Sequence, residues 1–129
     1  MDNVSSIKFD YKIIRKPKKP SENLFEYAAY LNIMHKNKVF LTIDDICIID
    51  LIHELSSYDL NLSTYEFIPI DAEDKVLIFK RIGSKNIEIS SEWTDNKIVI
   101  NEKELIDSIK LLKLDFEKKS KVKISRYYK

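Results

Sequence analysis

The sequence contains few of the residues that familiar ligand sites require. Gly83 is its only glycine, whereas the phosphate-binding loops of nucleotide-binding proteins place several residues without a Cβ next to the anion. Cys47 is its only cysteine, so no disulfide can form within the chain. Residues 1–10 are polar and charged and lack the apolar core of a secretory signal. We therefore expect a cytoplasmic protein without a nucleotide-binding loop.

The sequence also lacks long apolar runs. None approaches the roughly 20 residues that cross a membrane, so we expect no membrane association. With 129 residues, the chain can bury about two-thirds of the surface that it exposes when unfolded, and no Ser/Gly-rich linker divides it. Residues 1–129 are therefore predicted to form a single domain that ends in a basic tail at 121–129.

Histidines are scarce as well, which limits the chemistry that the chain can perform. His35 and His53 are the only two, and zinc sites need three or four ligands at spacings that do not occur here. Asp50, His53 and Glu54 would share one face of a helix, as in an acid–base cluster. A histidine three residues after an aspartate is, however, more typical of a local pair on the surface. No nucleophile motif is present. We predict no metal site, no cofactor and no enzymatic activity.

Alternation of apolar and polar residues predicts three strands in the first third of the chain, at residues 4–14, 24–34 and 39–43. A polar segment with two prolines separates the first two strands. The spacing of apolar residues then becomes that of a helix over residues 43–57. Asp44 and Asp45 would lie at its positive N-terminal end.

Strand patterns return in the second half of the chain, at residues 65–70, 76–82, 86–91 and 97–100. A second helix follows them. Asn101 followed by Glu104 has the spacing of a capping box, which predicts a helix that begins there and ends near Ser120. Residues 121–129 alternate again and are compatible with an additional C-terminal edge strand.

This order predicts an α+β fold, with an antiparallel sheet of about seven strands and two helices on one face, in the order βββα ββββα. Trp93 is predicted to be buried at the edge of the sheet, because it is large and apolar. The predicted core comprises Phe9, Tyr27, Leu31, Ile48, Leu51, Ile52, Leu55, Phe67, Ile78, Ile89, Leu105, Ile109, Leu112 and Phe116.

The charges are unevenly distributed along the chain. The sequence has 22 basic and 21 acidic side chains, but the stretch between Lys38 and Lys75 contains nine acids and no lysine or arginine. This segregation favours an acidic face that attracts a basic protein partner. The alternative is that these acids complement the helix dipole and solvate turns, balanced by lysines from elsewhere in the fold. The predicted partner-binding residues are Asp50, Glu54, Asp59, Glu66 and Asp71.

The basic tail points to a different partner. Residues 118–129 combine lysines and Arg126 with Tyr127 and Tyr128, a mixture that can neutralise phosphates and stack on bases. A small nucleic-acid-associated or regulatory module is therefore the alternative function, although the net charge of +1 argues against nucleic acid as a partner. An accessory subunit of an enzyme is a third possibility.

Four features of the second half occur together: Tyr65-Glu66-Phe67, an acidic turn through Asp74, Leu77-Ile78-Phe79-Lys80, and Ile87–Trp93 before a capped helix. In this combination, over about residues 24–120, the chain resembles small, uncharacterised bacterial proteins that are similar to the immunity proteins of polymorphic toxins. The resemblance implies a cytoplasmic α+β domain that binds and blocks one cognate toxin, and it implies no catalytic residues. Our first hypothesis is a non-enzymatic immunity protein that neutralises a toxin by occlusion through its acidic face.

Overall fold

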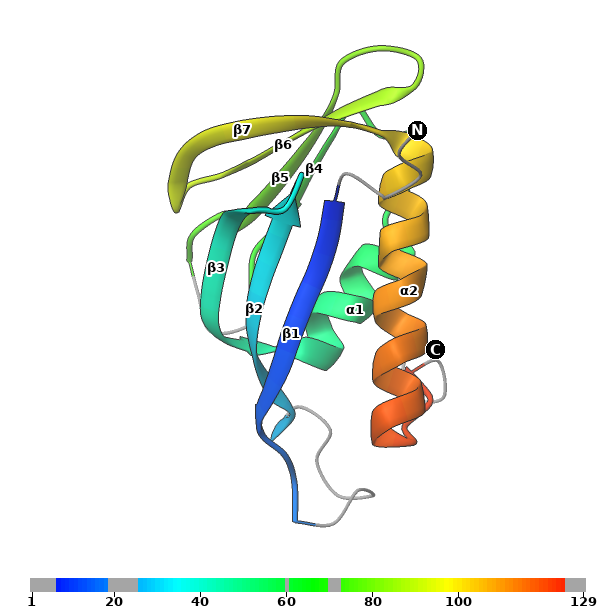
Figure 1. The fold of residues 1–129 in the computed structure, drawn as a ribbon. Helices are drawn as coiled ribbons and strands as arrows, with labels where there is room; N and C mark the ends of the chain where they lie inside the picture. The colour runs from blue at the N-terminus through cyan, green and yellow to red at the C-terminus, as the bar shows by residue number, and fades with distance from the viewer. Residues whose placement is uncertain (1–6, 19–25, 60, 70–72, 125–129) are drawn as a thin grey trace.

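The protein consists of two antiparallel sheets and two helices that share one core (Figure 1). The computed structural model describes residues 7–18, 26–59, 61–69 and 73–124. The elements follow the predicted order of three strands, a helix, four strands and a helix, which confirms the α+β class. The seven strands are divided between a three-stranded and a four-stranded sheet and do not form one continuous sheet.

The first sheet contains β1 (Ile7–Arg15), β2 (Ala28–His35) and β3 (Lys38–Cys47), hydrogen-bonded in that order. The alternation that predicts these strands also sets their register, because one face of the sheet has to reach the core. A turn at Lys36 and Asn37 joins β2 to β3, with φ angles of 52° and 67°. These positive angles match a hairpin turn whose twist follows that of the strands.

The helix α1 (Ile48–Ser57) begins later than the predicted residue 43, because β3 is longer than its sequence pattern indicates. Pairing between β2 and β3 continues to the end of β3, so ladder hydrogen bonds replace the first predicted helical turn. Asp44 and Asp45 therefore lie on β3 and not at the helix N-terminus. The Asp45 carboxylate instead forms an ion pair with Arg15 at 2.7 Å.

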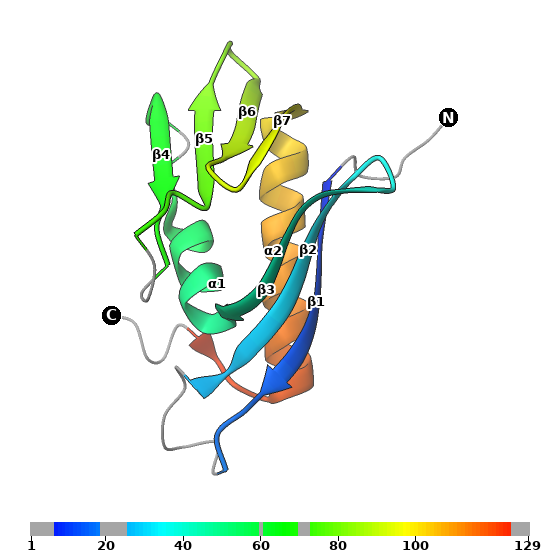
Figure 2. The same ribbon diagram turned by 90° about the vertical axis from the view of Figure 1, so that its left-hand side faces the viewer.

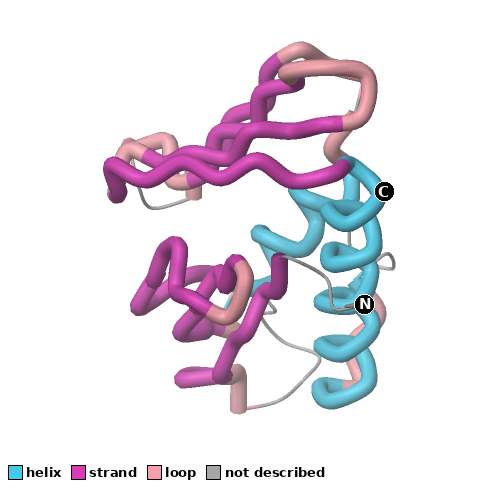
Figure 3. Tube along the Cα trace, turned by 45° about the horizontal axis from the view of Figure 1, so that its top comes forward, coloured by secondary structure: helices cyan, strands magenta, loops and turns pink. Residues whose placement is uncertain are grey.

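The second sheet contains β4 (Thr64–Phe67), β5 (Leu77–Arg81), β6 (Asn86–Ser91) and β7 (Thr94–Asn101), in that order. Both helices lie on the same side of the two sheets (Figure 3). Ile78 is only partly buried, which corrects its place in the predicted core. Its neighbours Leu77 and Phe79 are fully buried, and because strand residues alternate, Ile78 points to the outer face. The other predicted core residues are buried.

The helix α2 (Glu102–Ser120) has the predicted start and end. The Asn101 side chain accepts a hydrogen bond from the backbone N–H of Lys103 at 2.8 Å, which satisfies one of the unpaired donors of the first turn. At the other end, Lys121 adopts a φ of 62°, a left-handed conformation that commonly terminates helices.

The segment after α2 folds back onto the helix. Residues 121–124 form no strand, which corrects the predicted edge strand there, and residues 125–129 lie outside the described residues. Val122 and Ile124 are buried, and the backbone N–H of Ile124 donates to the Glu117 carboxylate at 2.8 Å. Burial of two apolar side chains and one charge-assisted hydrogen bond hold this segment in place.

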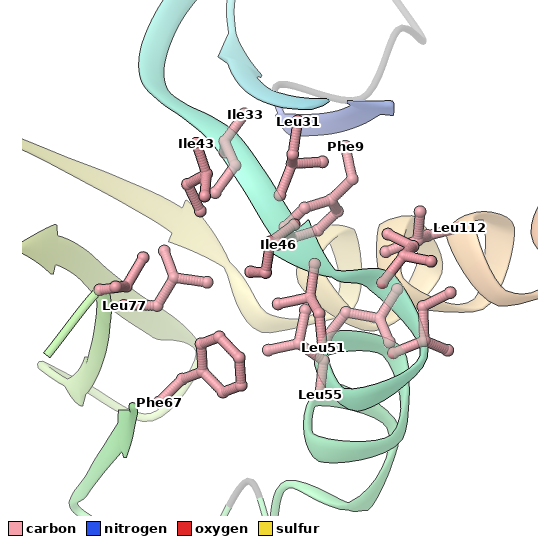
Figure 4. Close-up of a cluster of buried hydrophobic side chains, with 14 of the residues drawn as sticks. Phe9, Leu31, Ile33, Ile43, Ile46, Leu51, Leu55, Phe67, Leu77 and Leu112 are labelled. Atoms are coloured by element: carbon pink, nitrogen blue, oxygen red, sulfur yellow. The ribbon is translucent and has the colours of Figure 1, made fainter. Parts of the chain in front are cut away.

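A single apolar cluster joins the sheets and the helices. Side chains from both sheets and from both helices converge on it, as Figure 4 shows. α2 runs alongside β1 and also packs against α1 (Figure 2). The face that α1 turns to this cluster consists of Ile48, Ile49, Leu51, Ile52 and Leu55.

Trp93 is 43% exposed, so the prediction that it is buried is wrong. It lies in the turn between β6 and β7, where the alternation that buries Ile87 and Ile89 has ended. Its indole Nε1–H donates to Asp74 at 2.7 Å, which satisfies the polar edge of the ring at the surface.

We expect Leu51→Ala and Leu112→Ala each to lower the free energy of unfolding by about 2–5 kcal/mol, because both side chains are buried and leave cavities. Leu111 offers a matched control for Leu112 on α2, since the Leu111 side chain is 64% exposed. Leu111→Ala should change the stability by less than about 0.5 kcal/mol. Urea denaturation at about 1 µM protein measures these differences. Equal losses for Leu111 and Leu112 would contradict the orientation of α2.

Candidate partner-binding site

Two carboxylates lie one helical turn apart on the polar side of α1. Asp50 and Glu54 are both partly buried. Tyr65 of β4 donates its hydroxyl to Oε1 of Glu54 at 3.0 Å, which links the helix to the second sheet. The two carboxylates and the phenol therefore form one compact polar surface where α1 meets β4.

Burial and neighbouring negative charges both affect the titration of this surface. Burial raises the pKa of Asp50 above its ordinary value and the charge of Glu54 raises it further, against an opposing effect of His53. Burial also raises the pKa of Tyr65, together with the charge and hydrogen bond of Glu54 and the charge of Asp50. An additional negative charge is unfavourable here, so a positive charge brought by a partner would be favourable.

The ring of Tyr65 belongs to a group of packed aromatic side chains. The ring centroids of Tyr58 and Tyr65 are 4.8 Å apart, and Tyr58 also packs against Phe79 with a centroid distance of 5.2 Å. The Tyr58 hydroxyl is buried without a hydrogen-bond partner among the described residues. We name Asp50, Glu54, Tyr58 and Tyr65 the acidic–tyrosine cluster.

Asp59 and Glu66, two of the other predicted partner-binding residues, do not join this cluster. Asp59 follows α1 and accepts a hydrogen bond from the backbone N–H of Asn61 at 2.9 Å, as in a turn. Glu66 is next to Tyr65 on β4, so it points to the opposite face, where it forms an ion pair with Lys75 at 3.0 Å. Asp71 lies outside the described residues.

The sequence alone does not identify Tyr58 and Tyr65 as site residues. Its alternation places Tyr65 on the same face as Phe67, which is a signal that the ring points inward. The contact with Glu54 depends on how α1 packs against the second sheet, and no local pattern contains that information.

A cationic cleft of about 520 Å³ lies between the end of β1 and the end of α2. The Nζ atom of Lys119 lies 5.7 Å from the centre of the Tyr11 ring, a cation–π contact at its wall. Arg15, Lys16 and Lys18 are far from Lys119 in the sequence, and only the fold brings them to one cleft. The lining includes the basic residues Arg15, Lys16, Lys18 and Lys119 and the aromatic residues Tyr11, Tyr27 and Phe116.

Within the described residues, no group of three or more His, Cys, Asp or Glu side chains could hold a metal ion. No helix in that part of the chain has the length and apolar character needed to cross a membrane.

The chain is thus a small α+β protein whose distinctive surface features are an acidic–tyrosine cluster and a cationic cleft. Residues 6–120 match the family described as Domain of unknown function (DUF7878), and the chain belongs to that family. No curated protein and no solved structure matches the chain. The family description assigns no activity.

Tyr65→Phe removes the hydroxyl that is donated to Glu54 but keeps the aromatic ring. We expect it to lower the free energy of unfolding by about 1 kcal/mol, because the partly buried carboxylate loses a hydrogen bond. Glu66→Gln on the same strand is the matched control. It removes an exposed ion pair and should cost less than about 0.5 kcal/mol. Denaturant melts that show equal losses for the two variants would count against the role assigned to Tyr65.

Proposed function

We propose that this protein is a non-enzymatic binding protein that captures a basic protein partner through the acidic–tyrosine cluster. The observation that carries this proposal is the placement of Asp50 and Glu54 side by side next to Tyr65. Among the described residues, no ion pair joins a lysine or arginine to either carboxylate. A lysine or arginine of a partner would supply the positive charge that this surface lacks.

The two tyrosines add contact area to this charge. Tyrosine is enriched among the residues that dominate binding energy, because it combines a large ring with few rotatable bonds and one polar atom.

We further propose that the partner is a cognate toxin and that the protein acts in the cytoplasm as its immunity protein. Support comes from the resemblance of about residues 24–120 to small bacterial proteins that are similar to the immunity proteins of polymorphic toxins. A toxin that binds nucleic acid carries a basic surface, and covering that surface blocks it without any chemistry by the inhibitor. The other predicted acids, Asp59, Glu66 and Asp71, would add to the attraction at longer range and speed association.

The first test is a growth assay. The product of a toxin gene next to the gene of this chain is expressed with and without the chain in the same host. We expect the chain to restore growth and to form a complex with the toxin. Failure to protect, together with failure to form a complex, would contradict the proposal.

Charge reversal tests the site itself. Asp50→Lys and Glu54→Lys should each weaken the complex by at least about tenfold, because they place a positive charge against the basic partner. Asp95→Lys is the matched control, since it reverses an exposed acid on β7 and should change affinity less than about threefold. Isothermal titration calorimetry measures the affinity of the three variants for the toxin. Equal affinities for wild type and the cluster variants would remove the cluster from the mechanism.

The affinity should also fall as the pH falls through the raised pKa of Asp50. The free protein holds a proton on Asp50 more strongly than an ordinary aspartate does, whereas a bound cation favours the charged carboxylate. Binding at acidic pH therefore has to release this proton, so the full affinity is present above the raised pKa and is lost below it. Titrations between about pH 7 and pH 4.5 should show this loss, and Asp50→Asn should reduce it. An equal pH dependence of the affinity in the wild type and in Asp50→Asn would contradict the role assigned to Asp50.

The cationic cleft supports nucleic-acid binding as a second candidate function, because four basic side chains and three aromatic rings line one cavity. Fluorescence anisotropy with a labelled single strand separates the two candidates. Tight, salt-dependent binding that is lost in Lys16→Glu/Lys18→Glu would favour nucleic acid as the partner.

A further inference from the structure

The outer face of α2 carries an apolar stripe that nothing in the described structure covers. Leu111 and Leu114 are 64% and 63% exposed, more than the other exposed large hydrophobic residues in the described part of the chain. Asp107 and Lys118 extend the stripe at either end. The spacings of four, three and four residues place all four side chains on one side of the helix.

This stripe has a symmetry that a single copy of the chain does not require. Asp107 and Lys118 are equally far from the point midway between Leu112 and Lys113, and so are Leu111 and Leu114. Each acid on one side of the midpoint therefore matches a base on the other side, and each leucine matches a leucine.

Such a pattern is self-complementary about a twofold axis. If two α2 helices pack antiparallel with the axis at this midpoint, Asp107 lies opposite Lys118 of the second copy, and Leu111 lies opposite Leu114 of the second copy. Every contact occurs twice, so the charges complement each other across the whole stripe and the two apolar pairs lie at its centre.

We propose that α2 is the dimerisation surface of this protein and that its occupant is α2 of a second copy, packed antiparallel. The proposal rests on charge complementarity along the helix and is independent of the function proposed above. A parallel pair would place like residues opposite each other, with Asp107 facing Asp107 of the second copy, so the charge pattern also selects the antiparallel arrangement.

The surroundings of Leu111 favour this packing. A groove of about 410 Å³ between β1 and α2 has Leu111 in its wall together with Phe9 and Leu112. A leucine of the second copy that packs beside Leu111 would lie at the edge of this groove. Because two crossed helices bury less surface than a typical permanent dimer, we expect a reversible dimer with a micromolar dissociation constant.

Sedimentation equilibrium of the full chain, at concentrations from about 10 to 500 µM, tests the proposal. We expect a monomer–dimer equilibrium for the wild type. Leu111→Asp and Leu114→Asp should each raise the dissociation constant at least about tenfold, because they place a charge at the centre of the contact. Both side chains are exposed, so the variants should keep the wild-type circular dichroism spectrum. Val99→Asp is the matched control, since Val99 is 49% exposed on the second sheet and should leave the dimer unchanged.

A charge exchange tests the antiparallel register. Asp107→Lys alone and Lys118→Asp alone should each weaken the dimer, because each variant places like charges opposite each other twice. The double variant restores opposite charges and should return the dissociation constant to within about threefold of the wild type. A wild type that remains monomeric up to about 500 µM, or a dimer that Leu111→Asp leaves intact, would overturn the proposal. A double variant weaker than both single variants would overturn the antiparallel arrangement.

Discussion

The burial of one face of α1 between the two sheets is the constraint on which the rest of the structure depends. The sheets have separate hydrogen-bonded ladders, so side-chain packing holds them together. The first residue of α1 is fixed by the backbone N–H of Ile48, which donates to the carbonyl of Tyr27 at 3.2 Å. Each fully buried isoleucine or leucine of this helix contributes about 1.5–3 kcal/mol of transfer free energy.

The same burial determines what the protein presents to its surroundings. A helix with one face fixed in the core has to turn its polar residues outward, and this places Asp50 and Glu54 at the boundary with β4. Two like charges at this spacing destabilise a helix by about 0.2–0.5 kcal/mol. The core is large enough to tolerate that cost, and in the proposed complex a cationic partner would remove it.

Features that depend on neighbours in the sequence could be predicted from it, such as the order of the elements and the cap at Asn101. Features that depend on distant segments could not. The orientation of Ile78 follows from which face of the sheet meets the helices. The exposure of Trp93 has a local cause instead, because β6 ends at Ser91 and a turn follows. For the site, the gap in basic residues pointed to the two carboxylates of α1. Their contact with Tyr65, and the meeting of Lys119 with β1, arise only when segments far apart in the chain pack together.

The central claim is that the chain binds a basic partner where α1 meets β4. Hydrogen–deuterium exchange of the protein, alone and in complex with the toxin against which it protects, tests this claim most directly. The account predicts slower exchange in the complex over α1 and β4, with the outer face of the first sheet unchanged. Protection confined to the cationic cleft, with α1 and β4 exchanging as in the free protein, would contradict it.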